Sequence, residues 1–270
     1  MMKDRIHQTR VYLFKFLSLF FKTGGWKAFA FGAIISIIIV MVVGDNMFVY
    51  GLDTESGGFS FISACIWIGV FNSIQSICKE RDIIKREHRS GLHMSSYVLS
   101  RAIYELLICL VQAATMLILC AVLLDVPKNG LVSKSALIDF YITFFLVTLS
   151  ADYLGLAVSS IVKTTTTAMT VMPFLLIVQL VFSGVLFRLE GNAEKMAKAT
   201  ISKWGMEAFG SIADLNGIPY NAAGWIVAER NVYAYESGHV ECAWLIIIAF
   251  SVMYLLISII SLEFIDLDKR

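Results

Sequence analysis

Six apolar stretches, each roughly long enough to cross a lipid bilayer, alternate with polar segments along the chain. They are Trp26–Val43, Phe59–Cys78, Tyr97–Leu124, Ala136–Val162, Val171–Phe187 and Ala243–Leu262. A helix needs about 20 mostly apolar residues to cross the hydrocarbon core. Because backbone polar groups in lipid must pair within the protein, we expect every stretch to be an α-helix. The predicted fold class is an all-α membrane protein with six transmembrane helices.

The segment before the first apolar stretch has a different pattern. In Thr9–Lys22 the polar and apolar side chains separate onto different faces of a helix. The polar ones are Gln8, Lys15, Ser18 and Lys22, and the apolar ones are Val11, Phe14, Leu17 and Phe21. This pattern favours an N-terminal helix lying in the membrane interface. The alternative is that the segment is only the basic flank of the first span.

The polar segment after the fifth stretch also contains structure. Trp204–Ala213 and Asn221–Ala228 are apolar but too short to cross a bilayer. We expect short re-entrant helices that dip into or cap the outer end of the bundle. The chain is therefore interpreted as one membrane domain. Its parts are an interfacial helix (1–25), five spans (26–187), an outer segment (188–241) and a sixth span (243–262).

Composition and charge placement add an orientation. Hydrophobic residues make up 58% of the chain and charged residues 16%, against about 45–50% and 25% in soluble domains. Lysine and arginine gather in the N-terminal segment and in the loop 79–96, whereas the loop 44–58 has none. Basic loops stay in the cytoplasm. We therefore expect a multi-pass protein with both termini cytoplasmic.

The sequence lacks the motifs of enzymes and of nucleic-acid-binding proteins. It has no GxxxxGK[ST] phosphate loop, no HExxH and no GxSxG. The five cysteines form no CxxC pair and show no metal-ligand spacing, and no basic stripe interleaved with aromatic residues is present. We expect no catalytic residues, no metal site and no cofactor in this chain.

The loop Lys79–His93 is the first candidate functional region. It is dense in charge, yet it carries the apolar residues Ile83 and Ile84. Glu80 and Glu87 are seven residues apart and would share one face of a helix. Such a helix is a good docking surface for a soluble partner, and the alternative is a solvated loop that only anchors the topology.

Polar residues inside the apolar stretches form a second candidate region. Asp152 lies near the middle of the fourth stretch, with Asn72 in the second, Gln112 in the third and Gln179 in the fifth. An ionised carboxylate at the bilayer centre costs about 2.5–3.5 kcal/mol. Asp152 must therefore face the bundle interior, where it either contacts substrate or accepts hydrogen bonds from a neighbouring helix.

A third candidate region is Val181–Leu189, at the end of the fifth stretch. Ser183 and Gly184 allow helices to approach closely. Val185 and Leu186 would then form an apolar constriction beside a two-fold axis, or simply pack between helices.

These regions together resemble a known family. In Cys78–Arg101, Glu80 is followed seven residues later by Glu87, then by Gly91 and by the run Ser95-Ser-Tyr-Val-Leu-Ser-Arg101. This pattern, the run Phe182-Ser-Gly-Val-Leu186 and the segment Ser202–Asn216 resemble the membrane domain of type-2 ABC exporters. The likeness is to the G subfamily and to its bacterial relatives paired with or fused to forkhead-associated ATPases.

The resemblance implies a mechanism and a set of sites. Two permease subunits, identical or different, would pair in a bacterial plasma membrane, and two ABC ATPase subunits would bind ATP and magnesium and dock below. Glu80, Arg81, Ile84 and Glu87 would form the ATPase-coupling helix. Ile68, Asn72, Asp152 and Gln179 would lie on the substrate pathway, and Val185 and Leu186 would plug the exit.

The function implied is export of an amphipathic, lipid-like or peptide-like substrate by alternating access. Hydrolysis would be done by a separate subunit. One departure from the family concerns the gate, because Val185 stands where paired leucines are common. The alternative function is a membrane scaffold or channel with no nucleotide-driven partner.

Overall fold

The computed structural model describes residues 2–44, 46–187, 189–221 and 230–265, and these are helical or lie in turns and connecting segments, with no strand among them. The long helices are α1 (Met2–Thr23), α2 (Lys27–Val43), α3 (Gly51–Ser73), α5 (Met94–Leu123), α6 (Ala136–Ile161), α7 (Thr165–Val181) and α10 (Ser237–Glu263). The short ones are η1 (Cys78–Glu80), α4 (Arg81–Arg89), α8 (Asn192–Ala197), α9 (Ile201–Ile212) and η2 (Asn231–Tyr233).

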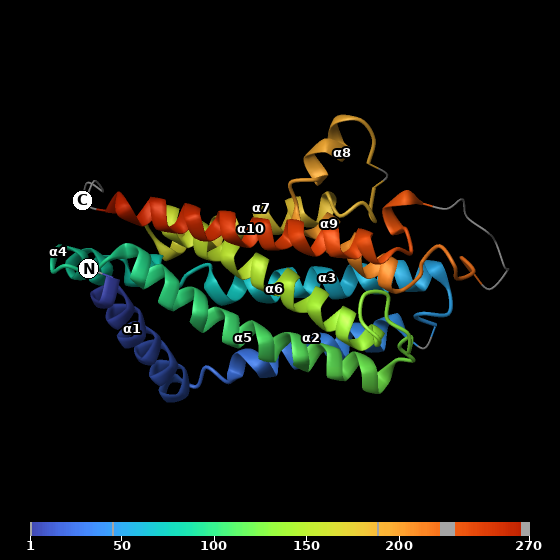
Figure 1. Cartoon of the computed structure of the whole chain (residues 1–270), viewed down its shortest axis with the longest axis horizontal. Coiled ribbons are helices and arrows are strands. Elements are labelled where there is room, and N and C mark those ends of the chain that lie inside the picture. The colour runs from blue at the N-terminus through green and yellow to red at the C-terminus, as the bar shows by residue number, and fades with distance from the viewer. Residues whose placement is uncertain (1, 45, 188, 222–229, 266–270) are drawn as a thin grey trace.

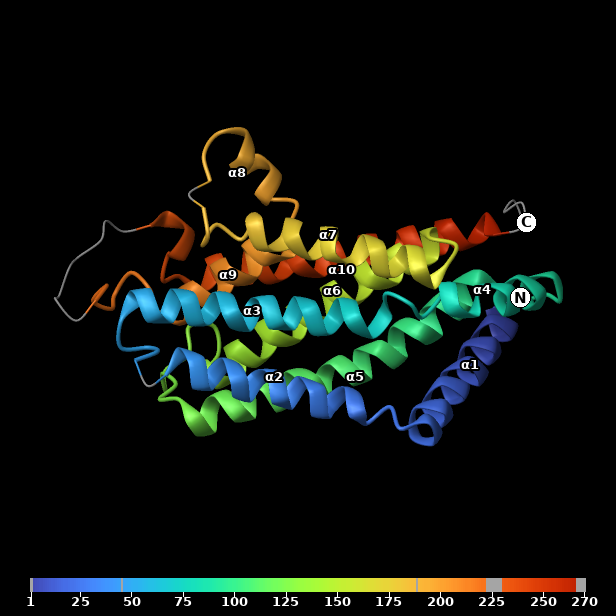
Figure 2. The ribbon, with the colours of Figure 1, turned by 180° about the vertical axis from the view of Figure 1, so that it is seen from behind.

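The helices form an elongated bundle with α3 and α6 at its centre (Figure 1). Helices α5 and α10 pack on α6, and α2 lies along α3 and α5 (Figure 2). At one end, which we call the α4 end, α4 lies near the start of α1 and the end of α10, and α1 slants away from the bundle axis. At the other end, the α9 end, α9 packs on α3, α6 and α10.

Each predicted span corresponds to a helix, but the helices differ in length. Among the described residues, four helical segments are long and apolar enough to cross a membrane: Gly51–Arg89, Met94–Leu123, Ala136–Ile161 and Ser237–Glu263. Helices α2 and α7 are apolar but have 17 residues each, which is about 26 Å at 1.5 Å per residue. Their crossing of the membrane therefore stays a prediction.

Several predicted boundaries were wrong, among them the end of α3, which is Ser73 and not Cys78, and the start of α10, which is Ser237 and not Ala243. The loop assigned to 44–58 is helical from Gly51, because the first amides of α3 are capped from far along the chain: Gly51 N–H donates to Pro219 O (2.9 Å) and Leu52 N–H to Tyr220 O (3.0 Å). Helix α7 begins at Thr165, since the Thr164 hydroxyl accepts from Thr167 N–H (3.2 Å). It ends at Val181, whereas the sequence predicted an end at Phe187.

The segment after α7 contains a predicted and an unpredicted helix. Helix α9 coincides with the expected short helix Trp204–Ala213 and begins three residues earlier. The six-residue α8 was not predicted. The second expected helix, Asn221–Ala228, falls outside the described residues except for its first residue.

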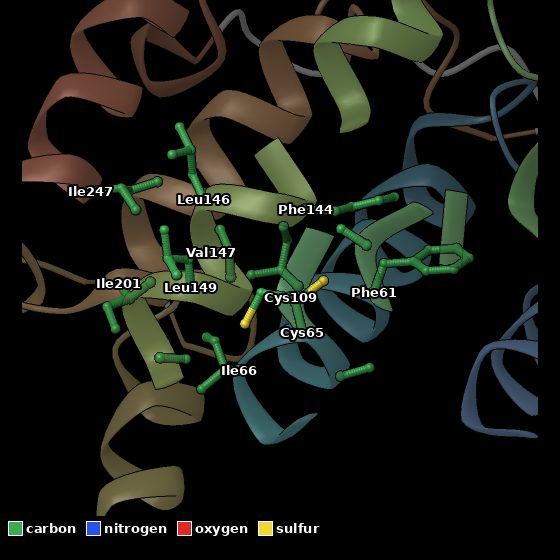
Figure 3. Packing of buried hydrophobic residues seen from close by; sticks show 14 of the residues in the cluster. Phe61, Cys65, Ile66, Cys109, Phe144, Leu146, Val147, Leu149, Ile201 and Ile247 are labelled. Atoms are coloured by element: carbon green, nitrogen blue, oxygen red, sulfur yellow. The ribbon is translucent and has the colours of Figure 1, made fainter. Parts of the chain in front are cut away.

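Close contact between α3 and α6 organises the core. A β-carbon added at Gly69 would lie 2.3 Å from Thr148 O, and one at Gly155 would lie 2.4 Å from Ser73 Oγ. Phe61 of α3 stacks on Phe144 of α6 with ring centroids 5.7 Å apart, within the cluster drawn in Figure 3. In lipid such close packing takes the place of the hydrophobic effect as the force between helices.

Candidate functional site

Helix α4 is fixed to the bundle by a small apolar core of its own. Its Ile84 is fully buried, together with Ile77, Leu92 and Tyr97 on either side of it in sequence. Phe16 of α1 and Leu262 of α10 belong to the same cluster. The charged loop recognised in the sequence is therefore a packed helix in contact with α1, α5 and α10.

Helix α1 is tied to α4 by polar contacts. The Tyr12 hydroxyl donates to Glu87 Oε2 at 2.5 Å. The Gln8 side chain of α1 also binds the turn that follows α4. Its Nε2 donates to Gly91 O (3.0 Å) and its Oε1 accepts from His93 N–H (3.1 Å). Burial, and then the bond to Glu87, raise the pKa of Tyr12, so this phenol keeps its proton and remains the donor.

The other end of α4 is tied to the last turn of α6. The Arg81 guanidinium donates from Nη1 to Ser160 O (2.7 Å) and to Val162 O (3.2 Å). Ser159 Oγ accepts from the backbone N–H groups of Ile77 (3.0 Å) and Cys78 (3.1 Å). Helix α4 and the η1 turn before it are therefore joined by hydrogen bonds to both α1 and α6.

The residues predicted for coupling and the exposed residues of α4 are different sets. Ile84 and Glu87 face the bundle, Arg81 reaches α6, and Glu80 lines a cavity beside α1. The side chains on the outer face of α4 include Asp82, Ile83 and Arg86, and Ile83 is 40% exposed. Sequence reasoning missed this stripe, although its spacing of three to four residues is that of one helix face.

The polar residues inside the bundle differ in their contacts, and Asp152 Oδ1 finds no hydrogen-bond partner among the described residues. Asn72 and Gln112 exchange two hydrogen bonds (2.8 and 3.2 Å) between α3 and α5. Asp152 is fully buried, and its carboxylate lies 3.7 Å from Cys109 Sγ. Gln179 Oε1 accepts from Ser202 N–H (3.1 Å) and thereby joins α7 to α9. Asn72, Gln112 and Gln179 therefore join helices, and both alternatives for Asp152 stay predictions.

The remaining predicted pathway and gate residues lie elsewhere. Ile68 faces α2, where its Cδ1 lies 3.8 Å from a β-carbon added at Gly32. Val185 and Leu186 follow the end of α7 and Gly184, whose φ is +84°. Val185 packs against the core, whereas Leu186 is 52% exposed. Ile68 therefore packs between helices, and of the two predicted gate residues Leu186 is the exposed one.

A charged pocket of about 410 Å³ opens at the α9 end. The Arg230 guanidinium makes two hydrogen bonds to the Glu55 carboxylate (2.7 and 2.8 Å), and the Tyr233 hydroxyl donates to the same carboxylate (3.1 Å). Lys203 pairs with Glu207 in the lining of the same pocket. Burial, and then the charge of Glu55, raise the pKa of Tyr233. Because 175 residues separate Glu55 from Arg230, the sequence pattern gave no sign of this site.

Comparison with known proteins decides the family. The family model described as ABC-2 type transporter matches residues 5–212, from α1 through α9. The chain belongs to the ABC-2 type transporter family. The resemblance seen in the sequence is thereby confirmed, and the matched family is one of ABC transporter permeases.

A curated relative agrees with this assignment. The ABC-2 chain is 26% identical over 153 residues to the ABC transporter ATP-binding/permease protein Rv1747 of Mycobacterium tuberculosis. The matched region is 56% of this chain and 18% of the relative. The ABC-2 chain thus spans less than a fifth of that protein's length.

Proposed function

We propose that this chain is the permease subunit of an ATP-driven exporter whose ATP and magnesium are bound by separate ABC ATPase subunits. The observation that carries the proposal is the packing of α4. It presents Asp82, Ile83 and Arg86 outward while Glu87 and Arg81 tie its inner face to α1 and α6. Such a helix receives a push from a docked partner and passes it to the bundle.

The proposal places the α4 end in the cytoplasm of a bacterial cell, in agreement with the basic residues of the N-terminal segment and of 79–96. Helix α1 then lies in the membrane interface, and α2 and α7 complete six spans. Their length of about 26 Å is slightly below the hydrocarbon thickness, which local thinning of the bilayer or flanking residues accommodate at modest cost.

In this scheme ATP is a ligand that binds one conformation of the complex better than the other and so shifts the equilibrium between them. Closure of the ATPases moves α4. The Tyr12–Glu87 bond carries the movement to α1, and the Arg81 contacts carry it to α6. The reset follows hydrolysis in the partner.

A second permease subunit, identical or different, covers the apolar face of α3 and α7 in this proposal. Trp67 and Phe174 are 43% and 67% exposed there. A cavity lined by such residues suits amphipathic, lipid-like or peptide-like cargo. Leu186 and Val185, just beyond α7, are proposed to close the exit. The rival function, a scaffold or channel without an ATPase, leaves the outer stripe of α4 without a partner.

A photo-activatable cross-linker placed at Ile83 in native membranes tests the proposal. We expect irradiation to capture an ABC ATPase at Ile83, because this side chain is exposed on α4. The matched control is the same cross-linker at Glu194 on α8, exposed toward the α9 end of the bundle, where no ATPase should be captured. Capture at both positions, or at neither, contradicts the proposed docking surface.

A further inference from the structure

A cavity of about 550 Å³ lies at the α4 end beside α1. One part of its wall is apolar and comes from three helices: Phe16 and Leu19 of α1, Phe71 of α3 and Met169 of α7. The other part is charged and contains Lys79, Glu80 and Arg101. The volume is within the range of small-molecule sites, and the division of the wall suits a ligand with a charged head and an apolar tail.

Two charged groups in this wall have unused hydrogen-bonding atoms. Glu80 Oε2 and Arg101 Nε are both buried and find no hydrogen-bond partner among the described residues. A buried polar group without a partner is strongly disfavoured, the more so when it is charged. The carboxylate can accept a further hydrogen bond and the guanidinium can donate one, so a ligand that carries both a donor and an acceptor would complement the pair.

The position of Arg101 is fixed by its neighbours. Its guanidinium pairs with Glu105 at 2.8 Å. It also lies over the rings of Phe16 and Tyr104, with the guanidinium carbon 4.9 and 5.0 Å from the ring centroids. Contacts of this kind hold a guanidinium in one orientation. The group is therefore set in place before any ligand arrives.

From these observations we infer that the cavity binds the headgroup of a zwitterionic phospholipid with a primary amine, a phosphoethanolamine lipid. Its ammonium donates to Glu80, and its phosphate accepts from Arg101 and Lys79. The first carbons of its acyl chains lie against Phe16 and Phe71. The inference rests on the proposed function in one respect: the proposed orientation places the bound lipid in the inner leaflet.

The surroundings favour a lipid over a soluble phosphoethanolamine. Three aromatic side chains of α1 and the turn after it, Phe14, Phe21 and Trp26, are 74%, 79% and 61% exposed. Aromatic residues at this density on one short segment are typical of contact with the lipid interface. The cavity thus lies where a lipid headgroup is already present at high concentration.

The test is native mass spectrometry of the full chain, purified in detergent and stripped of lipid. The probes are phosphatidylethanolamine, phosphatidylcholine and phosphatidylglycerol with identical acyl chains. We expect the ethanolamine lipid to bind about tenfold more tightly than the other two, because only it donates charged N–H groups to a carboxylate. Equal binding of the three lipids would overturn the inference.

Two substitutions locate the binding. Glu80→Gln should lower the affinity for the ethanolamine lipid to that for the choline lipid. Asp82→Asn removes the same charge two residues away on the exposed face of α4 and should leave the preference unchanged. Ser76 lines the cavity from the turn after α3, and Ser76→Phe, which fills the cavity, should reduce binding of all three lipids. A preference that survives Glu80→Gln and Ser76→Phe places the lipid elsewhere and contradicts the site.

Competition with soluble phosphoethanolamine tests whether the cavity binds a membrane lipid or the free headgroup. We expect it to compete weakly, since it lacks the acyl chains that the apolar wall contacts. Competition as strong as that of the lipid would contradict a lipid site. None of these outcomes depends on an ATPase, so failure here is distinct from failure of the cross-linking at Ile83.

Discussion

Replacing Gly69 with alanine is expected to remove most of the folded protein from the membrane. The added methyl group would lie 2.3 Å from Thr148 O, 2.8 Å from Asp152 N and 2.9 Å from the Ala151 side chain. Two of these are backbone atoms of α6, which cannot turn aside as a flexible side chain does. Overpacking costs about 1–3 kcal/mol, and we expect Gly69→Ala to reach the upper part of that range.

The measurement is the thermal unfolding temperature of the purified chain in detergent, with the yield of monodisperse protein beside it. Gly32→Ala is the control, because α2 leaves room there: the nearest atom to the added methyl group is Ile68 Cδ1 at 3.8 Å. Removing a glycine from a helix interior is worth roughly 0.5–1 kcal/mol, so this variant should be unchanged or slightly more stable. Equal stability of the two variants would show that α3 and α6 do not pack as described.

The second large effect is expected from Glu87→Lys. The substitution removes the acceptor of the Tyr12 hydroxyl, which lies 2.5 Å away, and places a positive charge in its stead. A hydrogen bond to a charged group contributes about 1.5–3 kcal/mol. Because Glu87 is only half-buried, we take the lower end, which corresponds to about a tenfold change in an equilibrium. We expect stimulation of the partner ATPase by the permease to fall by about that factor.

Tyr12→Phe separates the hydrogen bond from the charge. It removes the same bond from the α1 side and leaves Glu87 in place, so it should reproduce part of the uncoupling. ATPase stimulation in proteoliposomes, normalised to inserted permease, is the readout. Full stimulation in the well-inserted Glu87→Lys variant would mean that the contact between α1 and α4 carries no signal.

The positions of the membrane helices could be predicted from the sequence because lipid imposes one requirement on all of them. A stretch of about 20 apolar residues in lipid must be a helix, and Ala136–Val162 accordingly matches α6 almost residue for residue. The start of α3 could not be predicted in this way. Its first two amides are capped by Pro219 and Tyr220, and a local pattern carries no information on such distant partners.

In the candidate site too, local sequence patterns could be read but contacts between distant residues could not. The spacing of Glu80 and Glu87 predicted that the two share one face of a helix, but Glu80 lies in η1, before α4 begins. Charge alone could not show that Glu87 accepts a hydrogen bond from Tyr12, which comes from another helix. The Glu55–Arg230 pair at the α9 end was missed for this reason as well. Ile83, in contrast, could have been found from helix geometry, since it is about 100° around α4 from the buried Ile84 and so leaves the face that Ile84 buries.

The most direct test of the central claim is affinity purification of this permease from its native membrane in mild detergent, with identification of the copurifying proteins and assay of their ATPase activity. We predict a stoichiometric ABC ATPase that hydrolyses ATP and a complex with two permease subunits. A pure permease that brings down no ATPase, from membranes in which the Ile83 cross-linker also captures none, would contradict the exporter and favour a scaffold or channel.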